Sequence, residues 1–455
     1  MKGANTLQKI FFVSLGCDKN LVDSEIMLGI LDEHGYSITT NENQADIIII
    51  NTCGFIMDAT EEGIETILGL AEQKRDGTCK CLIVTGCMAQ RYKEEIFKEL
   101  PEVDAVVGTG DFEKIAEVIR DVQAGKNQYL LTGSESNFSE ESAYKRIIST
   151  AGHFAYLKIA EGCDNHCTYC TIPSIRGAYK SRSLESLIKE AEILVSKGVK
   201  ELVLVAQDTT LYGKDLYGSP KLSNLLDELS KIEDLEWIRI LYAYPENITQ
   251  DIIDAMARNN KVCKYIDMPI QHASDAVLKR MGRRSTSNKI KQIVAKLREA
   301  MPDIAIRTTI IVGFPGETQQ DFDFLQNFIL EMEFDRLGAF TYSQEDGTPA
   351  SIMEDQIDED VKEHRKQELL DVQKHISAKK LYNLIGETLK VVVEGKLEDE
   401  QNVYIGRSEK DCYEVDGFVF FKCEYELLTG DFVSVNINES SDYDVMGVVE
   451  DELSK

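Results

Sequence analysis

Three cysteines within eight residues form the part of this chain best suited to bind a metal. Cys163, Cys167 and Cys170 follow the spacing C-x3-C-x2-C. Thiolates are the protein ligands of iron–sulfur clusters and of many zinc sites, and closed sites of both kinds use four ligands. Three thiolates leave one coordination position open to a small molecule. The spacing therefore predicts a reactive metal site rather than a purely structural one.

A zinc site is the main alternative at this motif, because His166 offers a fourth ligand between the cysteines. His166 is adjacent to Cys167 in the sequence, however, and two neighbouring residues fit poorly on one tetrahedron. Three unconnected buried cysteines are a second alternative, since cysteine is often buried as a small hydrophobic residue. The rest of the chain favours the open cluster over both.

Three more cysteines each follow a predicted β-strand in the first part of the chain. Apolar, β-branched strands alternate with helices there, a pattern typical of an open parallel α/β sheet. We expect the strands at residues 10–15, 47–51, 82–85 and 105–107, and helices at residues 24–34, 60–73 and 92–100. Cys17, Cys53 and Cys87 come at the ends of the first three strands. Because ligands bind beyond the carboxyl ends of parallel strands, these thiols are expected to converge in a second three-thiolate site.

The other five cysteines are interpreted as buried apolar residues. They are Cys79, Cys81, Cys263, Cys412 and Cys423. Cys81 lies inside its predicted strand rather than at the end, which excludes it from the second site.

A second series of strands and helices begins at Phe154 and predicts an incomplete barrel. Six strands are expected, at residues 154–160, 201–206, 237–241, 265–269, 304–312 and 337–342, with amphipathic helices such as 184–197 and 288–300 between them. Six such units fit an open-sided (β/α)6 barrel better than a closed eightfold one. Barrel active sites lie at the carboxyl-terminal face, and the C-x3-C-x2-C motif follows the first strand, so we expect it there.

A charged helical stretch, residues 358–384, leads to a tail that predicts a small antiparallel β-barrel. Its strands are expected at residues 389–393, 403–405, 418–421 and 432–435. Residues 386–455 contain 18 acidic and 6 basic residues, a net charge of −12. The expected domains are residues 1–130, a Ser-rich linker at 131–150, the barrel at 151–384 and the small β-barrel at 385–455.

Composition narrows the class of protein and of partner. The chain has 455 residues, a net charge of −29 and 43% hydrophobic residues, an ordinary balance for a globular protein of several domains. Its 11 cysteines are not paired like a secreted framework, and we expect neither a secretory signal nor a membrane span. These observations predict a cytoplasmic protein. The acidity favours a basic macromolecular partner over nucleic acid.

The chain resembles the radical S-adenosylmethionine methylthiotransferases along nearly its whole length. The C-x3-C-x2-C motif is shared with the wider radical superfamily, Cys17, Cys53 and Cys87 match the family's amino-terminal domain, and the tail is similar to its TRAM domain. The stretches 13–25, 172–177, 271–274 and 311–317 together match the branch of the family that modifies a ribosomal protein.

The resemblance implies two 4Fe-4S clusters and S-adenosylmethionine as cofactors. It implies that Cys163, Cys167 and Cys170 hold the radical-generating cluster, whose open iron binds S-adenosylmethionine, and that Cys17, Cys53 and Cys87 hold an auxiliary cluster. One S-adenosylmethionine would supply the methyl group and another the radical. No further catalytic residue is predicted beyond the cluster ligands.

Several weaker contacts are predicted, each with a structural role as the alternative. Gln207, Asp208, Arg307 and Gly313 are expected to bind the cofactor: the first two end the second barrel strand, Arg307 would pair with a carboxylate, and Gly313 would let backbone approach the adenosine. Lys19 and Arg176 are interpreted as solvated surface charges, or else as contacts of an acidic substrate side chain.

The resemblance also implies a substrate, an aspartate of protein twelve of the small ribosomal subunit that becomes 3-methylthioaspartate. The partners would be this protein, free or in the ribosome, an electron donor and a sulfur donor, with no membrane. The alternatives are a tRNA methylthiotransferase of the MiaB type and a non-catalytic iron–sulfur carrier. The acidic tail argues against tRNA as the substrate.

Overall fold

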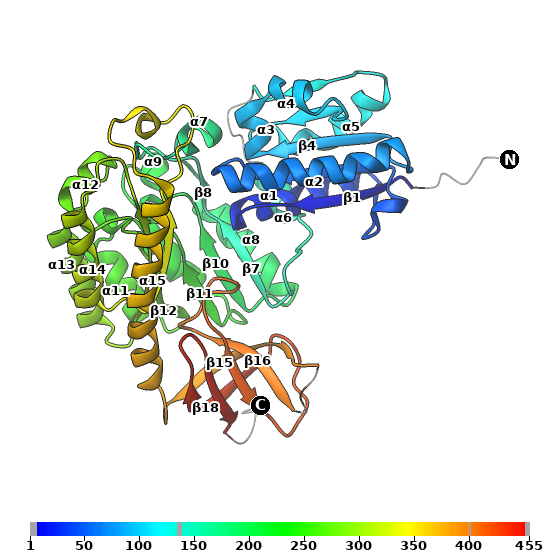
Figure 1. Cartoon of the computed structure of the whole chain (residues 1–455). Helices are drawn as coiled ribbons and strands as arrows, with labels where there is room; N and C mark the ends of the chain where they lie inside the picture. Colours follow the sequence, from blue (N-terminus) through cyan, green and yellow to red (C-terminus); the bar gives the residue numbers. More distant parts are fainter. Residues whose placement is uncertain (1–6, 134–138, 399, 401, 451–455) are drawn as a thin grey trace. The chain divides into compact units, whose positions relative to one another are not determined.

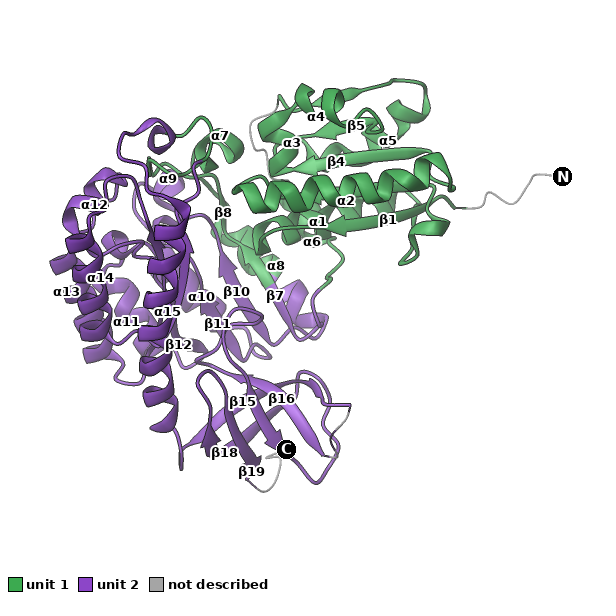
Figure 2. Cartoon of the chain, in the orientation of Figure 1, with its two compact units in different colours: residues 1–149, 156–190, 345–348 green, residues 150–155, 191–344, 349–455 purple. Residues whose placement is uncertain are grey.

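The computed structural model describes residues 7–133, 139–398, 400 and 402–450 (Figure 1). The chain divides into two compact units, which Figure 2 colours separately. The first comprises Met1–Ser149, Tyr156–Glu190 and Glu345–Thr348, and the second Thr150–Ala155, Ala191–Gln344 and Pro349–Lys455. Each unit is built from several stretches of the chain, so the boundaries of the four segments expected from sequence stay predictions.

The first unit is organised around a parallel sheet with the strand order β2-β1-β3-β4-β5-β6. The strands are β1 (Lys9–Ser14), β2 (Ser37–Ile38), β3 (Ile47–Thr52), β4 (Cys81–Gly86), β5 (Ala105–Val107) and β6 (Tyr129–Leu131). The predicted open parallel α/β sheet is therefore confirmed. The sequence reading missed β2 and β6, which have only two and three residues and carry little pattern.

Helices cover both faces of this sheet, which explains the apolar run at its centre. Ile47 and Ile49 of β3 pack in one core cluster, and Ile48 and Ile50 pack in the other. A strand buried on both faces reads as a continuous hydrophobic run rather than as an alternation. The helices are α1 (Asp18–Glu33), α2 (Met57–Arg75), α3 (Cys87–Tyr92), α4 (Glu94–Glu99) and α5 (Ile115–Gln123).

The segment predicted as a Ser-rich linker contains packed structure. Leu131 ends β6, and α6 (Glu140–Tyr144) begins after Ser139, whose side chain accepts a hydrogen bond from the backbone of Ser142. Arg146 is buried and pairs with Glu25 at 2.9 Å. Residues 134–138 lie outside the described part. Arg146 thus ties the end of this segment to α1 of the sheet domain.

The second unit contains the predicted strands of the incomplete barrel. They form a six-stranded sheet with the order β14-β13-β12-β11-β10-β7, in which β10 to β14 pair in parallel. Its strands are β7 (Phe154–Lys158), which begins in this unit, β10 (Glu201–Val205), β11 (Trp237–Ile240), β12 (Val262–Asp267), β13 (Ala305–Val312) and β14 (Arg336–Thr341). All six strands expected from the sequence are confirmed.

Helices follow the strands of this sheet. They include α10 (Leu222–Leu229), α11 (Gln250–Arg258), α12 (Asp275–Arg280), α13 (Ser287–Ala300), α14 (Gln319–Met332) and the long α15 (Glu359–Tyr382), with the short α9 (Lys214–Tyr217) after β10. In the described part of the chain, no helix combines the length and the apolar character that crossing a bilayer requires.

The tail forms a closed five-stranded barrel with the order β15-β16-β17-β19-β18. Its strands are β15 (Thr388–Lys396), β16 (Val403–Ser408), β17 (Val419–Lys422), β18 (Phe432–Ser440) and β19 (Val445–Val449). The predicted small β-barrel is confirmed, with one difference in detail: β17 pairs with β19 in parallel, while the other pairs are antiparallel. The sequence reading missed β19.

A buried ion network ties the small barrel to the parallel sheet within the second unit. The Glu201 carboxylate of β10 accepts hydrogen bonds from Arg239 of β11 and from Arg407 of β16, both at 2.7 Å. All three side chains are almost completely buried. Burial raises the pKa of Glu201, but Arg407 and Arg239 outweigh it and lower that pKa to about 2.

Candidate functional site

The sheet of the first unit brings Cys17, Cys53 and Cys87 to one edge. They follow β1, β3 and β4, which are neighbouring parallel strands, and therefore lie beyond the carboxyl ends of all three. Burial raises the pKa of the Cys87 thiol to about 12; nearby Arg176 lowers it, and the charges of Cys17 and Cys53 raise it. Burial also raises the pKa of Cys53, and Cys17 adds to that rise. The three thiols thus share one electrostatic environment.

Glycines before two of these cysteines allow the loops to approach closely. Gly16 has a φ of +91°, and a Cβ on it would lie 2.8 Å from the Cβ of Cys53. Gly86 has a φ of +94°, and its Cβ would lie 2.5 Å from the carbonyl oxygen of Thr52. Both positions combine a left-handed backbone with a contact that only glycine tolerates. The Gly-Cys pairs were visible in the sequence, although their steric role was not.

Asn20 links the loops that carry the three thiols, and sequence reasoning missed it. Its side chain is buried and donates hydrogen bonds from Nδ2 to the carbonyls of Leu15, at 3.0 Å, and Thr52, at 2.9 Å. Its Oδ1 accepts a hydrogen bond from the Cys87 thiol at 3.8 Å. Asn20 therefore contacts the residue two before Cys17, the residue before Cys53, and Cys87 itself.

The donor set fits an iron–sulfur cluster in its chemistry, since it offers three thiols on one sheet edge with backbone tightly gathered around them. Among the residues described, however, no three thiol, imidazole or carboxylate groups already stand together as a metal site. The fold brings the three thiols to one edge of the sheet.

The second cysteine set lies on a loop whose two ends are held together in the same unit. The short strands β8 (Ala160–Glu161) and β9 (Lys180–Ser181) pair in antiparallel fashion on either side of it. Inside the loop, the Cys163 amide donates to the carbonyl of Gly177 at 3.1 Å, and the Cys170 amide donates to that of Cys167 at 3.2 Å. The β8–β9 pair and these two hydrogen bonds fold the C-x3-C-x2-C motif into a compact turn.

Burial within this loop separates the cysteines from His166. Cys163 and Cys167 are buried and Cys170 is half-buried, whereas His166 is exposed. This disfavours the zinc alternative, which needs the imidazole on the same side as the thiols. Gly162, just before the motif, has a φ of +74°, and a Cβ there would lie 2.1 Å from the carbonyl oxygen of Ala178.

A buried network of charges lies between the two cysteine sets, all of it within the first unit. Arg176, at the end of α7 (Ile172–Arg176), donates from Nη1 to Asp23 and to Glu161, both at 2.9 Å. Lys158 pairs with the same two carboxylates, lying 2.8 Å from Glu161. From Nη2, Arg176 donates to Asn20 Oδ1 at 2.6 Å and to the Sγ of Cys87 at 3.4 Å.

The interpretation of Lys19 and Arg176 as solvated charges was wrong. Arg176 is 3% exposed and is held by the partners just described, and Lys19 is buried with its Nζ 3.0 Å from Asp18. The sequence carried a signal for Arg176, because it ends the short helix that follows the cysteine motif. That signal did not show that Asp23, in α1, would lie opposite.

The four residues predicted to bind the cofactor lie in the second unit, with structural contacts on three of them. Asp208 is buried, caps the turn Thr209–Leu211 and accepts a hydrogen bond from Asn247 at 3.0 Å. Gln207 precedes it, just beyond β10. Gly313 has a φ of +72°, and a Cβ there would meet the Lys362 side chain at 2.3 Å.

Arg307 lies near the amino end of β13, whereas cofactors of parallel sheets bind at the carboxyl end. Its Nη1 donates to Asp267 at 2.8 Å, and its Nε lies 3.4 Å from Asp416. A cofactor contact by Arg307 would have to replace these ion pairs, so the structure gives it a role in joining the sheet to the small barrel.

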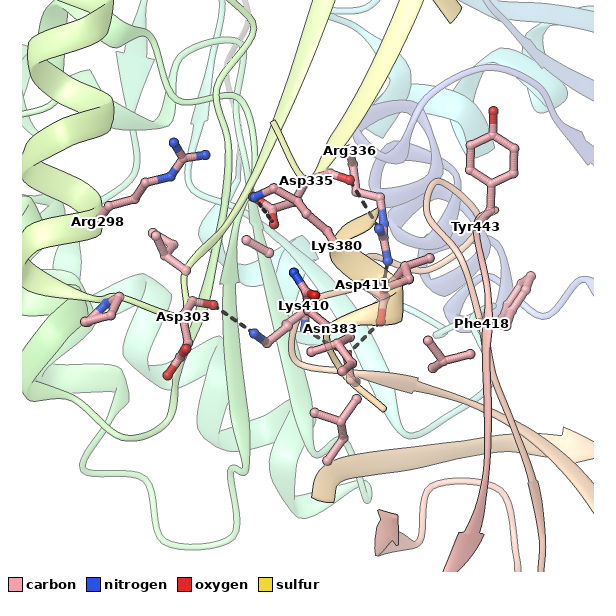
Figure 3. Close-up of a pocket in the computed structure, with 18 residues that line it drawn as sticks. Arg298, Asp303, Asp335, Arg336, Lys380, Asn383, Lys410, Asp411, Phe418 and Tyr443 are labelled. Atoms are coloured by element: carbon pink, nitrogen blue, oxygen red, sulfur yellow. Dashed lines mark hydrogen bonds and ion pairs between the residues drawn. The ribbon is translucent and has the colours of Figure 1, made fainter. Parts of the chain in front are cut away.

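A cavity of about 170 Å³ in the second unit lies where the parallel sheet, α15 and the small barrel meet, and we do not interpret it as a reactive site (Figure 3). Four of the charged groups on its wall form two ion pairs: Lys380 with Asp335 at 2.8 Å and Arg336 with Asp411 at 2.5 Å. Lys410 donates to the carbonyl of Asp303 at 3.0 Å. Because Arg336 begins β14, the cavity lies at the amino end of that strand, opposite to the end where ligands bind.

Comparison with known proteins assigns the chain to a family. Residues 9–108 match the uncharacterized protein family UPF0004, residues 157–329 the Radical SAM superfamily, and residues 385–449 the TRAM domain. A protein of Geobacter sulfurreducens named ribosomal protein uS12 methylthiotransferase RimO is 51% identical over 446 residues, which cover 98% of this chain and 99% of that protein. The chain belongs to the RimO family.

Other RimO relatives are equally similar along their whole length. The RimO proteins of Lachnoclostridium phytofermentans and Clostridioides difficile are each 50% identical to this chain, over 97% and 98% of its length and 100% of their own. The resemblance to radical methylthiotransferases inferred from the motifs is thereby confirmed, and the match to the ribosomal-protein branch with it.

Solved structures support the fold. The radical S-adenosylmethionine methyltransferase TsrM from Kitasatospora setae aligns with a TM-score of 0.56 at 12% identity, covering 85% of this chain and 78% of that one. The cobalamin-dependent S-adenosylmethionine radical enzyme OxsB aligns with a TM-score of 0.54 at 14% identity, covering 81% and 56%. At these identities the likeness concerns the fold alone.

Proposed function

We propose that this chain is a radical S-adenosylmethionine methylthiotransferase that converts an aspartate of ribosomal protein uS12 to 3-methylthioaspartate. The observation that carries the proposal is the identity of about half of all residues to RimO proteins over almost the entire chain. The two cysteine sets gathered in the first unit support it, because two sites with an open metal position suit a reaction that joins sulfur to carbon.

Each cysteine set would hold one 4Fe-4S cluster in this proposal. Cys163, Cys167 and Cys170 would hold the cluster that binds S-adenosylmethionine, and Cys17, Cys53 and Cys87 the auxiliary one. When bound, these groups supply the reductive cleavage that activates an unreactive C–H bond and the chemistry that delivers sulfur. The six thiols would bind the clusters. Gly162 and Asn20 set the conformation of the loops that carry these thiols.

The three cysteines of the auxiliary set differ in exposure. Cys87 is 4% exposed and Cys53 is half-buried, while Cys17 is exposed. The open face of this site is therefore on the side of Cys17. A substrate side chain that approaches the sulfur would come from that side, because Cys87 is buried and contacts Arg176 and Asn20.

Charge supports a ribosomal protein as the substrate. The chain carries a net charge of −29, and residues 386–455 carry −12 of it. An acidic surface attracts a basic protein and repels the phosphate backbone of tRNA. Replacing hydrogen by a methylthio group requires sulfur and a methyl group, and the reductive cleavage of S-adenosylmethionine requires an electron. A sulfur donor and an electron donor would therefore be partners, in the cytoplasm where uS12 is made.

An anaerobic assay with two candidate substrates tests the proposal. The cluster-reconstituted protein, S-adenosylmethionine, sulfide and a reductant are incubated with uS12 or with tRNA, and 5′-deoxyadenosine is measured alongside the product mass. We expect 5′-deoxyadenosine and a methylthio group on uS12. Modified tRNA would place the chain in the tRNA-modifying branch, and cluster binding without 5′-deoxyadenosine would support the carrier alternative.

A further inference from the structure

One guanidinium contacts a predicted cluster ligand and a carboxylate close to the other cysteine set. Arg176 Nη2 lies 3.4 Å from the Sγ of Cys87, and Nη1 lies 2.9 Å from Glu161, two residues before Cys163. The whole group belongs to the first unit and is buried, so water does not screen it.

The two edges of this guanidinium have different partners. Nη1 faces the carboxylates of Asp23 and Glu161, which Lys158 also neutralises. Two cations and two carboxylates balance the formal charge of that group. Nη2 faces Asn20 Oδ1 and the Cys87 sulfur, and neither is an anion while Cys87 is a thiol.

The N–H group aimed at the sulfur is therefore not needed to balance the carboxylates. The N–H donors of the planar arginine guanidinium point in fixed directions. The position of the guanidinium therefore decides which group accepts a hydrogen bond from Nη2. Asn20 fixes that position, because its Oδ1 holds Nη2 at 2.6 Å. Hydrogen bonds to the sulfur atoms of the ligands are one of the factors that set the reduction potential of iron–sulfur clusters in proteins.

We propose that Arg176 is a positioning residue that raises the reduction potential of the cluster held by Cys17, Cys53 and Cys87, through its hydrogen bond to the Cys87 sulfur. A positive donor at a ligand sulfur stabilises the reduced cluster, which carries one more negative charge, over the oxidised one. The inference rests on the proposed function, since it requires that these thiols bind a cluster.

A redox titration of the auxiliary cluster alone tests this. The full-length chain carrying Cys163→Ala, Cys167→Ala and Cys170→Ala is reconstituted, so that one cluster gives the signal. Its reduced fraction is followed by electron paramagnetic resonance at controlled potential, with Arg176 intact, as Arg176→Met and as Arg176→Lys. Iron content per chain is measured in each sample.

We expect Arg176→Met to lower the ratio of reduced to oxidised cluster about tenfold at the midpoint potential of the reference, in the range of a lost hydrogen bond from a charged donor. Arg176→Lys keeps the positive charge but lacks the planar set of N–H donors. It should lower the ratio of reduced to oxidised cluster by less than Arg176→Met does. Lys158→Met removes a buried cation of the same network that does not contact the sulfur, and we expect less than about a threefold change.

The outcomes separate this inference from the proposed function. A reference protein that binds no iron through Cys17, Cys53 and Cys87 would contradict both. A bound cluster with the same ratio in Arg176→Met, or with an equal shift in Lys158→Met, would overturn the role of Arg176 alone. If Arg176→Met does not fold, the Arg176→Lys variant decides, and an unchanged ratio there overturns the inference.

Discussion

Asn20 Nδ2 lies 2.9 Å from the carbonyl oxygen of Thr52, so that the first turn of α1 is bonded to the residue before Cys53. The same nitrogen donates to Leu15, which precedes Cys17 by two residues. A single amide thus sets the separation of two loops that start on different strands. The geometry of the auxiliary site depends on this contact as much as on the thiols.

Replacing Asn20 should weaken the auxiliary cluster. Asn20→Ala removes both hydrogen bonds that Nδ2 donates to the loops, and with them the Oδ1 acceptor of Arg176 and Cys87. Outer-shell changes of this kind cost about 10–100-fold in metal affinity. We expect iron per chain after reconstitution to fall from about eight to about four atoms, those of the cluster on the C-x3-C-x2-C loop. Asn259→Ala, which also removes two hydrogen bonds but in the second unit, is the control and should keep its iron.

Gly162 should be required for binding of the cluster on the C-x3-C-x2-C loop. Gly162→Ala forces a Cβ to 2.1 Å from the Ala178 carbonyl at a positive φ, so the backbone before Cys163 must move. We expect loss of the cluster on that loop and of 5′-deoxyadenosine formation, with the auxiliary cluster retained. Gly198→Ala has a φ of +103° with open space around it, and should cost only about 1–2 kcal/mol of backbone strain. Equal iron in both variants would contradict this role.

The thiols of the auxiliary site should differ in reactivity before any cluster is bound. Cys17 is exposed, whereas burial raises the pKa of Cys87 to about 12 and keeps it protonated at pH 8. With iodoacetamide and peptide mass mapping of cluster-free protein, we expect Cys17 to be alkylated at least about tenfold faster. Cys263, also buried with its pKa raised to about 12, is the internal reference for an inaccessible thiol. Similar rates at Cys17 and Cys87 would show that the site is open on both sides.

Glu201 should make the second unit sensitive to acid. Its pKa is about 2 in the folded chain and near its ordinary value of 4.5 when unfolded, so its stabilisation is complete above about pH 4.5 and is lost as pH falls toward 2. Glu201→Gln leaves Arg239 buried without its anion and Arg407 with the Glu394 carboxylate alone, and should lower the free energy of unfolding by about 3 kcal/mol at pH 7.

The fluorescence of Trp237, the one tryptophan in the sequence, reports on this unit during urea unfolding. Glu228→Gln, which breaks an exposed ion pair with Lys231 in the same unit, is the matched control and should change the free energy by less than about 0.5 kcal/mol. A Glu201→Gln protein that keeps the acid transition of the unsubstituted chain would contradict the assignment.

Much of the architecture could be predicted because it follows local patterns. The run at residues 47–51 was readable as a buried strand, observed as Ile47–Thr52, and the position of Cys53 after it placed the thiol at the sheet edge. The short strands β2 and β6 were missed, because two or three residues carry too little periodicity. The strand β19 was missed as well, although it closes the small barrel.

The ion network around Arg176 could not be predicted for a different reason. Its partners Asp23, Lys158 and Glu161 are ordinary charged residues whose spacing follows no motif, and only the folded chain brings α1 against the cysteine loop. Buried ion pairs between distant segments look like surface charges in a sequence. Arg307 shows the same limit, since its place on β13 suggested a ligand and its partners made it a structural link.

Tandem mass spectrometry of uS12 after the anaerobic reaction shows whether this protein modifies uS12 at one aspartate. We expect a methylthio group in place of one hydrogen on the β-carbon of a single aspartate, and we expect it to be absent when the enzyme carries Cys17→Ala or Cys163→Ala. Unmodified uS12, in a reaction where both clusters are bound and tRNA gains the methylthio group instead, would contradict this expectation.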